Sequence, residues 1–199
     1  YAGAASGLGA MLLDEEKITK GIAGALYTGI IHDTGVFQHS CTGTRTMEIA
    51  GKLMNTGIDF TKIIQDSFYT KTYAQNQIMG RTIMESIMLL HGKCIVGYVK
   101  QKDMKFYGVT GKDLGGIVSQ LRNTKGVEVA IFLYETGVQE YKVSMRSSGT
   151  VNVAKIASYF GGGGHVLAAG CTMQGSVYDV INSLTYDIEK QLQECENAD

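Results

Sequence analysis

The chain contains no proline and no tryptophan among its 199 residues. Proline makes up about 5% of an average protein, so the turns here must depend on Gly, Asn, Asp and Thr. Long apolar runs are also absent. None reaches the roughly 18 residues that a membrane-spanning helix needs, and the N-terminus shows no basic-then-apolar signal pattern. These absences predict a protein that does not enter a membrane.

The net charge of the chain is also close to zero. The 18 Lys and Arg residues and 19 Asp and Glu residues give −1 at pH 7. This excludes a nucleic-acid binder that acts through a strong overall positive field but allows a local basic site. The cysteines, Cys41, Cys94, Cys171 and Cys195, show neither a CxxC pair nor zinc-ligand spacing. We therefore expect reduced thiols in a cytoplasmic protein.

What the chain does contain is typical of a folded protein. Hydrophobic residues make up 44% and charged residues 19%, which is the balance of a globular chain with one large or two small domains. Helical apolar spacing predicts helices over residues 10–35 and 44–57, with Thr44 as a candidate cap for the second. A third helical pattern begins at Asp59 and meets no strong breaker before His91 and Gly92.

Beyond residue 91 the pattern changes. Short segments rich in β-branched and aromatic residues predict strands over 93–101, 127–136 and 139–148. Helices are expected over 111–126, 151–160 and 176–194. The last strand alternates, with Tyr141, Val143 and Met145 on one face and Lys142, Ser144 and Arg146 on the other. The sequence thus predicts an α/β fold, in which a helical part precedes a small mixed α/β unit.

A run of four glycines interrupts this second unit in YFGGGGHVLAAG, residues 159–170. It could be a hinge, a device for close backbone packing, or a binding loop whose amides and missing Cβ atoms admit a phosphate or ribose. His165 follows directly and could donate to a phosphate oxygen. Arg146 favours the binding loop, because a guanidinium is a well-matched phosphate clamp; the alternative is a solvated arginine on an edge strand.

Asp33, in the segment GIIHDTG, could have either a structural role or a role as a metal ligand. It ends an apolar helix directly before Thr34 and Gly35, so we expect its carboxylate in a tight, buried turn. The alternatives are an Asx-type turn or helix cap and a ligand for a hard cation such as Mn²⁺ or Mg²⁺. A single carboxylate cannot hold a metal alone, and the only nearby candidate donors are His32 and His39.

Two segments, GIIHDTGVFQHSCT and SMRSSGTVNVAKIASYFGGGGHVLAAG, make the chain recognisable. They resemble the C-terminal part of the DHH-family phosphoesterases, within the bacterial branch of nanoRNases and pAp phosphatases. The resemblance implies the end of a DHH catalytic domain over 1–70, a connecting helix over 71–91, and a DHH-associated substrate-binding domain over 92–199. It makes Asp33 a Mn²⁺ ligand and assigns substrate binding to the following residues: Arg146, Ser144, Gly161, Gly162, Gly163, Gly164 and His165.

The implied activity is Mn-dependent hydrolysis of very short RNA or of 3′-phosphoadenosine 5′-phosphate (pAp), with nucleotide phosphates as partners. Hydrolysis of cyclic dinucleotides and nucleotide or nucleic-acid binding without catalysis are the alternatives, and a homodimer is left open. The first three family motifs, Asp-His-His among them, do not occur in this sequence. We therefore expect a truncated chain that by itself binds nucleotides weakly and is catalytically incomplete.

Overall fold

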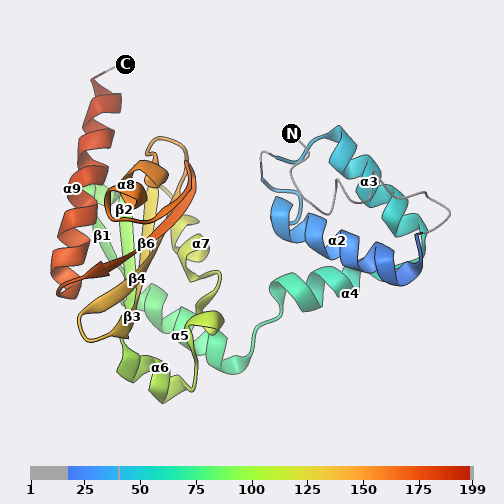
Figure 1. Ribbon diagram of the computed structural model, residues 1–199, viewed down its shortest axis with the longest axis horizontal. Helices are drawn as coiled ribbons and strands as arrows, with labels where there is room; N and C mark the ends of the chain where they lie inside the picture. Colours follow the sequence, from blue (N-terminus) through green and yellow to red (C-terminus); the bar gives the residue numbers. More distant parts are fainter. Residues whose placement is uncertain (1–17, 40, 198–199) are drawn as a thin grey trace. The chain divides into compact units, whose positions relative to one another are not determined.

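A computed structural model describes residues 18–39 and 41–197 of the chain (Figure 1). It divides into two compact units, residues 1–71 and residues 72–199. In the described ranges, no helix is both long and apolar enough to cross a membrane. The predicted fold class is confirmed: a helical part is followed by a mixed sheet with helices.

In the described part of the first unit lie three α-helices: α2 (Lys20–Thr34), α3 (Thr44–Asn55) and α4 (Phe60–Ile64), the last of which continues into a π-helical turn, Gln65–Tyr69. The Thr19 hydroxyl caps the start of α2, and Gly35 ends it in the left-handed conformation with φ 57°. The part of the predicted helix that precedes Ile18, residues 10–17, lies outside the described residues. The core of this unit consists of Ala23, Tyr27, Ile30, Ile31, Ala50, Leu53 and Ile58.

Two local predictions in this unit were wrong. The helical spacing predicts an apolar stripe of Ile18, Ile22, Ala25, Leu26, Gly29 and Ile30. The residues that α2 buries are instead Ala23, Tyr27, Ile30, Ile31 and Thr34, and Ile22 is 40% exposed. Helix α3 is not capped by Thr44; Gly43 precedes it and forms no side-chain cap. Helical periodicity alone specifies neither which side of α2 packs against the other helices nor at which residue α3 begins.

The continuous helix predicted from Asp59 was also wrong. The helical path breaks at Thr70, and α5 (Tyr73–Met84) starts afresh at a capping box between Thr72 and Gln75. Residues Ile87–Leu89 then form strand β1, which pairs antiparallel with β2 (Cys94–Val99). Their apolar run is equally compatible with helix and strand, and the partner strand decides the outcome.

The second unit contains a six-stranded sheet in the order β1-β2-β3-β4-β6-β5. Strands β3 (Val129–Gly137) and β4 (Glu140–Ser147) were predicted, as was β2; β5 (Gly163–His165) and β6 (Ala168–Gln174) were not. The pair β2–β3 is parallel. Its connection contains α6 (Gln101–Tyr107), which the sequence did not predict, and α7 (Ile117–Arg122), which is shorter than the predicted helix 111–126.

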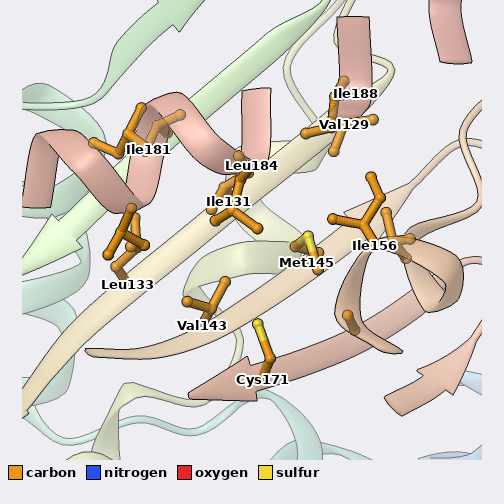
Figure 2. Close-up of a cluster of buried hydrophobic side chains, with 14 of the residues drawn as sticks. Val129, Ile131, Leu133, Val143, Met145, Ile156, Cys171, Ile181, Leu184 and Ile188 are labelled. Atoms are coloured by element: carbon orange, nitrogen blue, oxygen red, sulfur yellow. The ribbon is translucent and has the colours of Figure 1, made fainter. Parts of the chain in front are cut away.

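Helices α8 (Val153–Tyr159) and α9 (Val177–Glu196) cover one face of the sheet (Figure 1). Figure 2 shows Ile181, Leu184 and Ile188 of α9 packed over the strands. All three residues predicted on the apolar face of β4 are buried here. The strand residues of this core are Cys94, Val96, Val129, Ile131, Leu133, Tyr141, Val143, Met145, Ala169, Cys171 and Met173.

Helices α5, α6 and α7 cover the other face, but only over part of it. Their core contacts are with β2 and β3, through residues such as Ile95, Ala130 and Phe132. On β4 and β6 the residues of this face are half-buried or exposed: Lys142, Ser144, Arg146, Ala168, Gly170 and Thr172. The incomplete helical layer therefore leaves a polar half of the sheet open to ligands.

Candidate functional site

A cavity of about 600 Å³ lies over this open half of the sheet. Strands β4 and β6 form its floor, and the chain between α8 and β5 forms a wall. Its lining contains two cations and no carboxylate. The lining residues are Lys142, Val143, Ser144, Arg146, Phe160, Gly161, Gly162, Gly163, Ala168, Ala169, Gly170, Cys171 and Thr172.

Arg146 is half-buried at one end of this floor. Its Nη1 donates to the carbonyl oxygen of Met145 at 2.9 Å, and among the described residues no carboxylate pairs with it. Burial lowers the pKa of the Arg146 guanidinium, because removal from water disfavours the charged form. Arginine nevertheless remains charged in proteins. An anion in the pocket would therefore meet a cation with most of its five donors available.

Ser144 and Lys142 follow at alternating positions along the same face of β4. Ser144 is half-buried and Lys142 is exposed. Across the strand pair, Ser144 lies opposite Gly170 and Lys142 lies opposite Thr172. Sequence reasoning placed Lys142 on this face but did not include it in the site. Nothing in the sequence placed Thr172 at the site, because the strand that contains it, β6, was not predicted.

The first two glycines of the run end helix α8. Gly161 has φ 72°, and its N–H donates to the Ser158 carbonyl at 3.1 Å, while the Gly162 N–H donates to Ala157 at 2.8 Å. This is the Schellman arrangement that satisfies the last helical carbonyls. The expectation that the amides of this loop point freely at an anion is therefore wrong for Gly161 and Gly162.

The glycines from Gly162 to Gly164 differ in what surrounds them. A Cβ on Gly162 would lie 2.2 Å from the carbonyl oxygen of Gly170, and one on Gly164, at φ 148°, would lie 2.4 Å from that of Ala168. Both positions thus require glycine for close backbone approach. A Cβ on Gly163 would meet nothing within 4 Å. The run is both a packing device and a wall of the cavity.

The structure thus brings together five of the seven predicted substrate-binding residues. Arg146, Ser144 and Gly161–Gly163 line one cavity, whereas Gly164 and His165 are not among its lining residues. His165 is exposed and pairs with Ala168 where β5 turns into β6.

Asp33 lies in the last turn of α2 and is exposed rather than buried as expected. The chain then makes an unusual turn, in which Gly35, Val36 and Phe37 all have positive φ. The buried Thr34 hydroxyl holds this turn by donating to Ile30 at 2.7 Å and accepting from the Phe37 N–H at 3.0 Å. Helix packing beneath the turn leaves the Asp33 carboxylate on the surface.

Asp33 does not form a metal centre with its described neighbours. Nδ1 of His39 lies 3.2 Å from the carbonyl oxygen of Asp33, not from its carboxylate. In residues 18–39 and 41–197, no three His, Cys, Asp or Glu side chains gather closely enough to hold a metal ion. One carboxylate is too few for Mn²⁺, so these residues alone do not fit the metal that the family resemblance implies.

Comparison with known proteins identifies the second unit. Residues 91–194 match the DHHA1 domain. The chain is 26% identical over 180 residues to the bifunctional oligoribonuclease and PAP phosphatase NrnA of Bacillus subtilis, covering 90% of this chain and 56% of that protein. It is 30% identical over 159 residues to the protein of the same name from Thermus thermophilus, covering 79% and 46%.

The fold also matches a solved structure. An exopolyphosphatase-related protein from Bacteroides fragilis aligns with a TM-score of 0.84 and 23% identity, over 92% of this chain and 54% of that one. The chain spans about half the length of the curated relatives that it matches. The family resemblance seen in its two motifs is confirmed, and the chain belongs to the DHHA1 domain family as a distant homologue of NrnA.

Proposed function

We propose that this chain is the substrate-binding part of an NrnA-like phosphoesterase that hydrolyses very short oligoribonucleotides or pAp. The observation that carries the proposal is Arg146, a half-buried cation without a carboxylate partner among the described residues, in a cavity that no acidic residue lines. Such a site attracts an anion, and a guanidinium fork fits the oxygens of a phosphate.

The surroundings of Arg146 suit a nucleotide in particular. The Ser144 hydroxyl can donate to a phosphate or ribose oxygen. Gly163 and Gly170 add no side chain beside it, so a ribose could approach the backbone of the sheet and the wall. Mixed polar and apolar lining of this kind is typical of a small-molecule site. The names of the curated relatives, oligoribonuclease and PAP phosphatase, agree with this ligand class.

Hydrolysis in the whole protein is a separate part of the proposal. A pair of Mn²⁺ ions would supply an activated water and stabilise the leaving oxygen. We propose that Asp33 contributes one carboxylate to that centre. Because its described neighbours do not complete a metal site, no catalytic step is assigned to this chain. The reduced thiols expected from the cysteine pattern favour a cytoplasmic setting.

Binding without metal tests the proposal directly. Isothermal titration of the chain with pAp in the presence of a chelator should show weak but saturable binding. Replacement of Arg146 by Ala removes a charged hydrogen bond of about 1.5–3 kcal/mol, so affinity should fall at least tenfold. The matched control is Arg122→Ala on α7, since among the residues that the structure describes Arg122 bonds only its neighbour Asn123.

The outcome separates the alternatives as well. Unchanged affinity in Arg146→Ala would overturn the phosphate clamp. Release of product from a dinucleotide by the purified chain with Mn²⁺ would show that it is catalytically complete, contrary to expectation. Tighter binding of a cyclic dinucleotide than of pAp would favour the cyclic-dinucleotide phosphodiesterase instead.

A further inference from the structure

The cavity carries a second positive charge at the opposite end of its floor from Arg146. Lys142 lies four residues away on the same strand and the same face. A strand rises about 3.4 Å per residue, so the Cα atoms of Lys142 and Arg146 are about 14 Å apart. Ser144 lies midway between them. The polar row on β4 therefore runs along the cavity with a cation at each end.

Lys142 is available to a ligand. Its side chain is exposed and lines the cavity, and it forms no hydrogen bond or ion pair with any described residue. Its partners across the sheet are Tyr134 on β3 and Thr172 on β6, and neither carries a negative charge at neutral pH. Glu140, two residues before Lys142 on the same strand, accepts a hydrogen bond from the Thr136 hydroxyl at 2.6 Å and forms no ion pair with Lys142.

The two ends of the cavity also differ in how they are enclosed. Strand β5 pairs with β6 only from Ala168 to Gly170, beside Arg146 and Ser144. At Thr172, opposite Lys142, β6 has no β5 partner. The cavity is thus bordered by β5 at the Arg146 end and lacks this border at the Lys142 end. Because the cavity lining runs from Arg146 to Lys142, a ligand anchored at Arg146 has room to extend along β4 toward Lys142.

We propose that Lys142 is a specificity-determining residue, which binds a second backbone phosphate of an oligonucleotide whose first phosphate lies at Arg146. The cavity then selects ligands with more than one phosphate over a nucleoside monophosphate. This inference rests on the proposed function, since it requires a nucleotide at Arg146. It goes beyond that function because it assigns the preference for oligonucleotides over mononucleotides to one side chain, Lys142.

Affinity for two ligands measures this preference. The dissociation constants of AMP and of the trinucleotide pApApA are determined with a chelator present, so that no hydrolysis occurs. In Lys142→Ala, pApApA should bind about three- to fivefold more weakly, as expected for an exposed charge pair, while AMP should bind unchanged. The slope of log K against log salt for pApApA should become shallower by about 0.7, the value for one contact to a single strand.

Two further variants serve as controls. Lys142→Arg keeps the charge and should keep the preference for pApApA. Lys190→Ala removes the same charge from the exposed side of α9, which covers the opposite face of the sheet, and should leave both affinities unchanged. Thermal unfolding followed by circular dichroism should give the same midpoint for the Lys142 variants and the unaltered chain.

Each result has a defined meaning. If Lys142→Ala weakens AMP and pApApA equally, or behaves like Lys190→Ala, the assignment of Lys142 is overturned, while loss of both ligands in Arg146→Ala would still support the proposed function. If the unaltered chain binds neither ligand, the proposed function fails and the role of Lys142 fails with it.

Discussion

At the scale of the single residue, the glycines between Phe160 and His165 differ in purpose although they are identical in sequence. Gly161 is needed for its left-handed backbone, and Gly162 and Gly164 for the absence of a Cβ against β6. A Cβ would meet nothing within 4 Å at Gly161 or Gly163, but only Gly163 of these two lacks a positive φ, so it is the position where a side chain can be added without backbone strain. Substitutions at adjacent positions should therefore have different consequences.

Replacement of Gly163 by Val should abolish ligand binding and leave stability within about 0.5 kcal/mol, because the new side chain points into free space beside the cavity. Replacement of Gly162 by Val should instead destabilise the chain by roughly 1–3 kcal/mol, as overpacking does. Urea unfolding and pAp titration of both variants distinguish the two effects. If pAp bound normally to Gly163→Val, the glycine wall would not contact the ligand.

At the scale of the element, the sheet is tied to the loop that follows β4 by Glu128, next to the start of β3. Its carboxylate accepts hydrogen bonds from the hydroxyls of Ser148 and of Thr150, the latter at 2.9 Å. These two bonds, with a smaller effect of Lys93, lower the pKa of Glu128. The loop lies between β4, which carries Arg146, and helix α8, which leads to the glycines.

This pairing should make stability depend on pH. A carboxyl whose pKa is lower in the folded chain stabilises it fully above the unfolded value of about 4.3. The contribution disappears as the pH falls through the folded pKa. Urea unfolding between pH 6 and pH 3 should therefore show a smaller decline for Glu128→Gln than for the unaltered chain. A parallel decline would show that the carboxylate contributes nothing.

At the scale of the whole molecule, burial divides the four thiols into two classes. Cys41 and Cys195 are exposed, and Cys94 and Cys171 are buried in the sheet. Burial raises the pKa of Cys94 to about 12 and also raises the pKa of Cys171. Since the thiolate is the reactive form, the buried pair should be inert while the sheet is intact.

Thiol labelling followed by mass spectrometry should therefore modify two cysteines in the native chain and four in urea. In a Cys41→Ser, Cys195→Ser double variant, labelling should begin only at the urea concentration at which circular dichroism reports loss of the sheet. Rapid labelling of this variant in buffer would contradict the packing described for β2 and β6.

The predictability of the fold varied from element to element for physical reasons. The strand β4 was predicted with its correct faces because its alternation is complete from Tyr141 to Arg146. By contrast, β6 contains Ala168, Ala169 and Gly170, which have little strand preference of their own; pairing with β4 makes them a strand. The break at Thr70 was missed because it depends on polar caps within an apolar helical pattern.

What the sequence determined by itself was the chemistry: Arg146 and Ser144 on one face of a strand, the glycine run and the motif around Asp33 are all visible in the chain. Only the tertiary structure decided where that chemistry is accessible. Helices α5 to α7 bury their apolar side chains against β2 and β3, and Arg146 and Lys142 lie at the two ends of one open cavity over β4 and β6. Which part of a sheet the helices cover depends on contacts between segments far apart in the chain, and the local periodicity of the sequence does not predict these contacts.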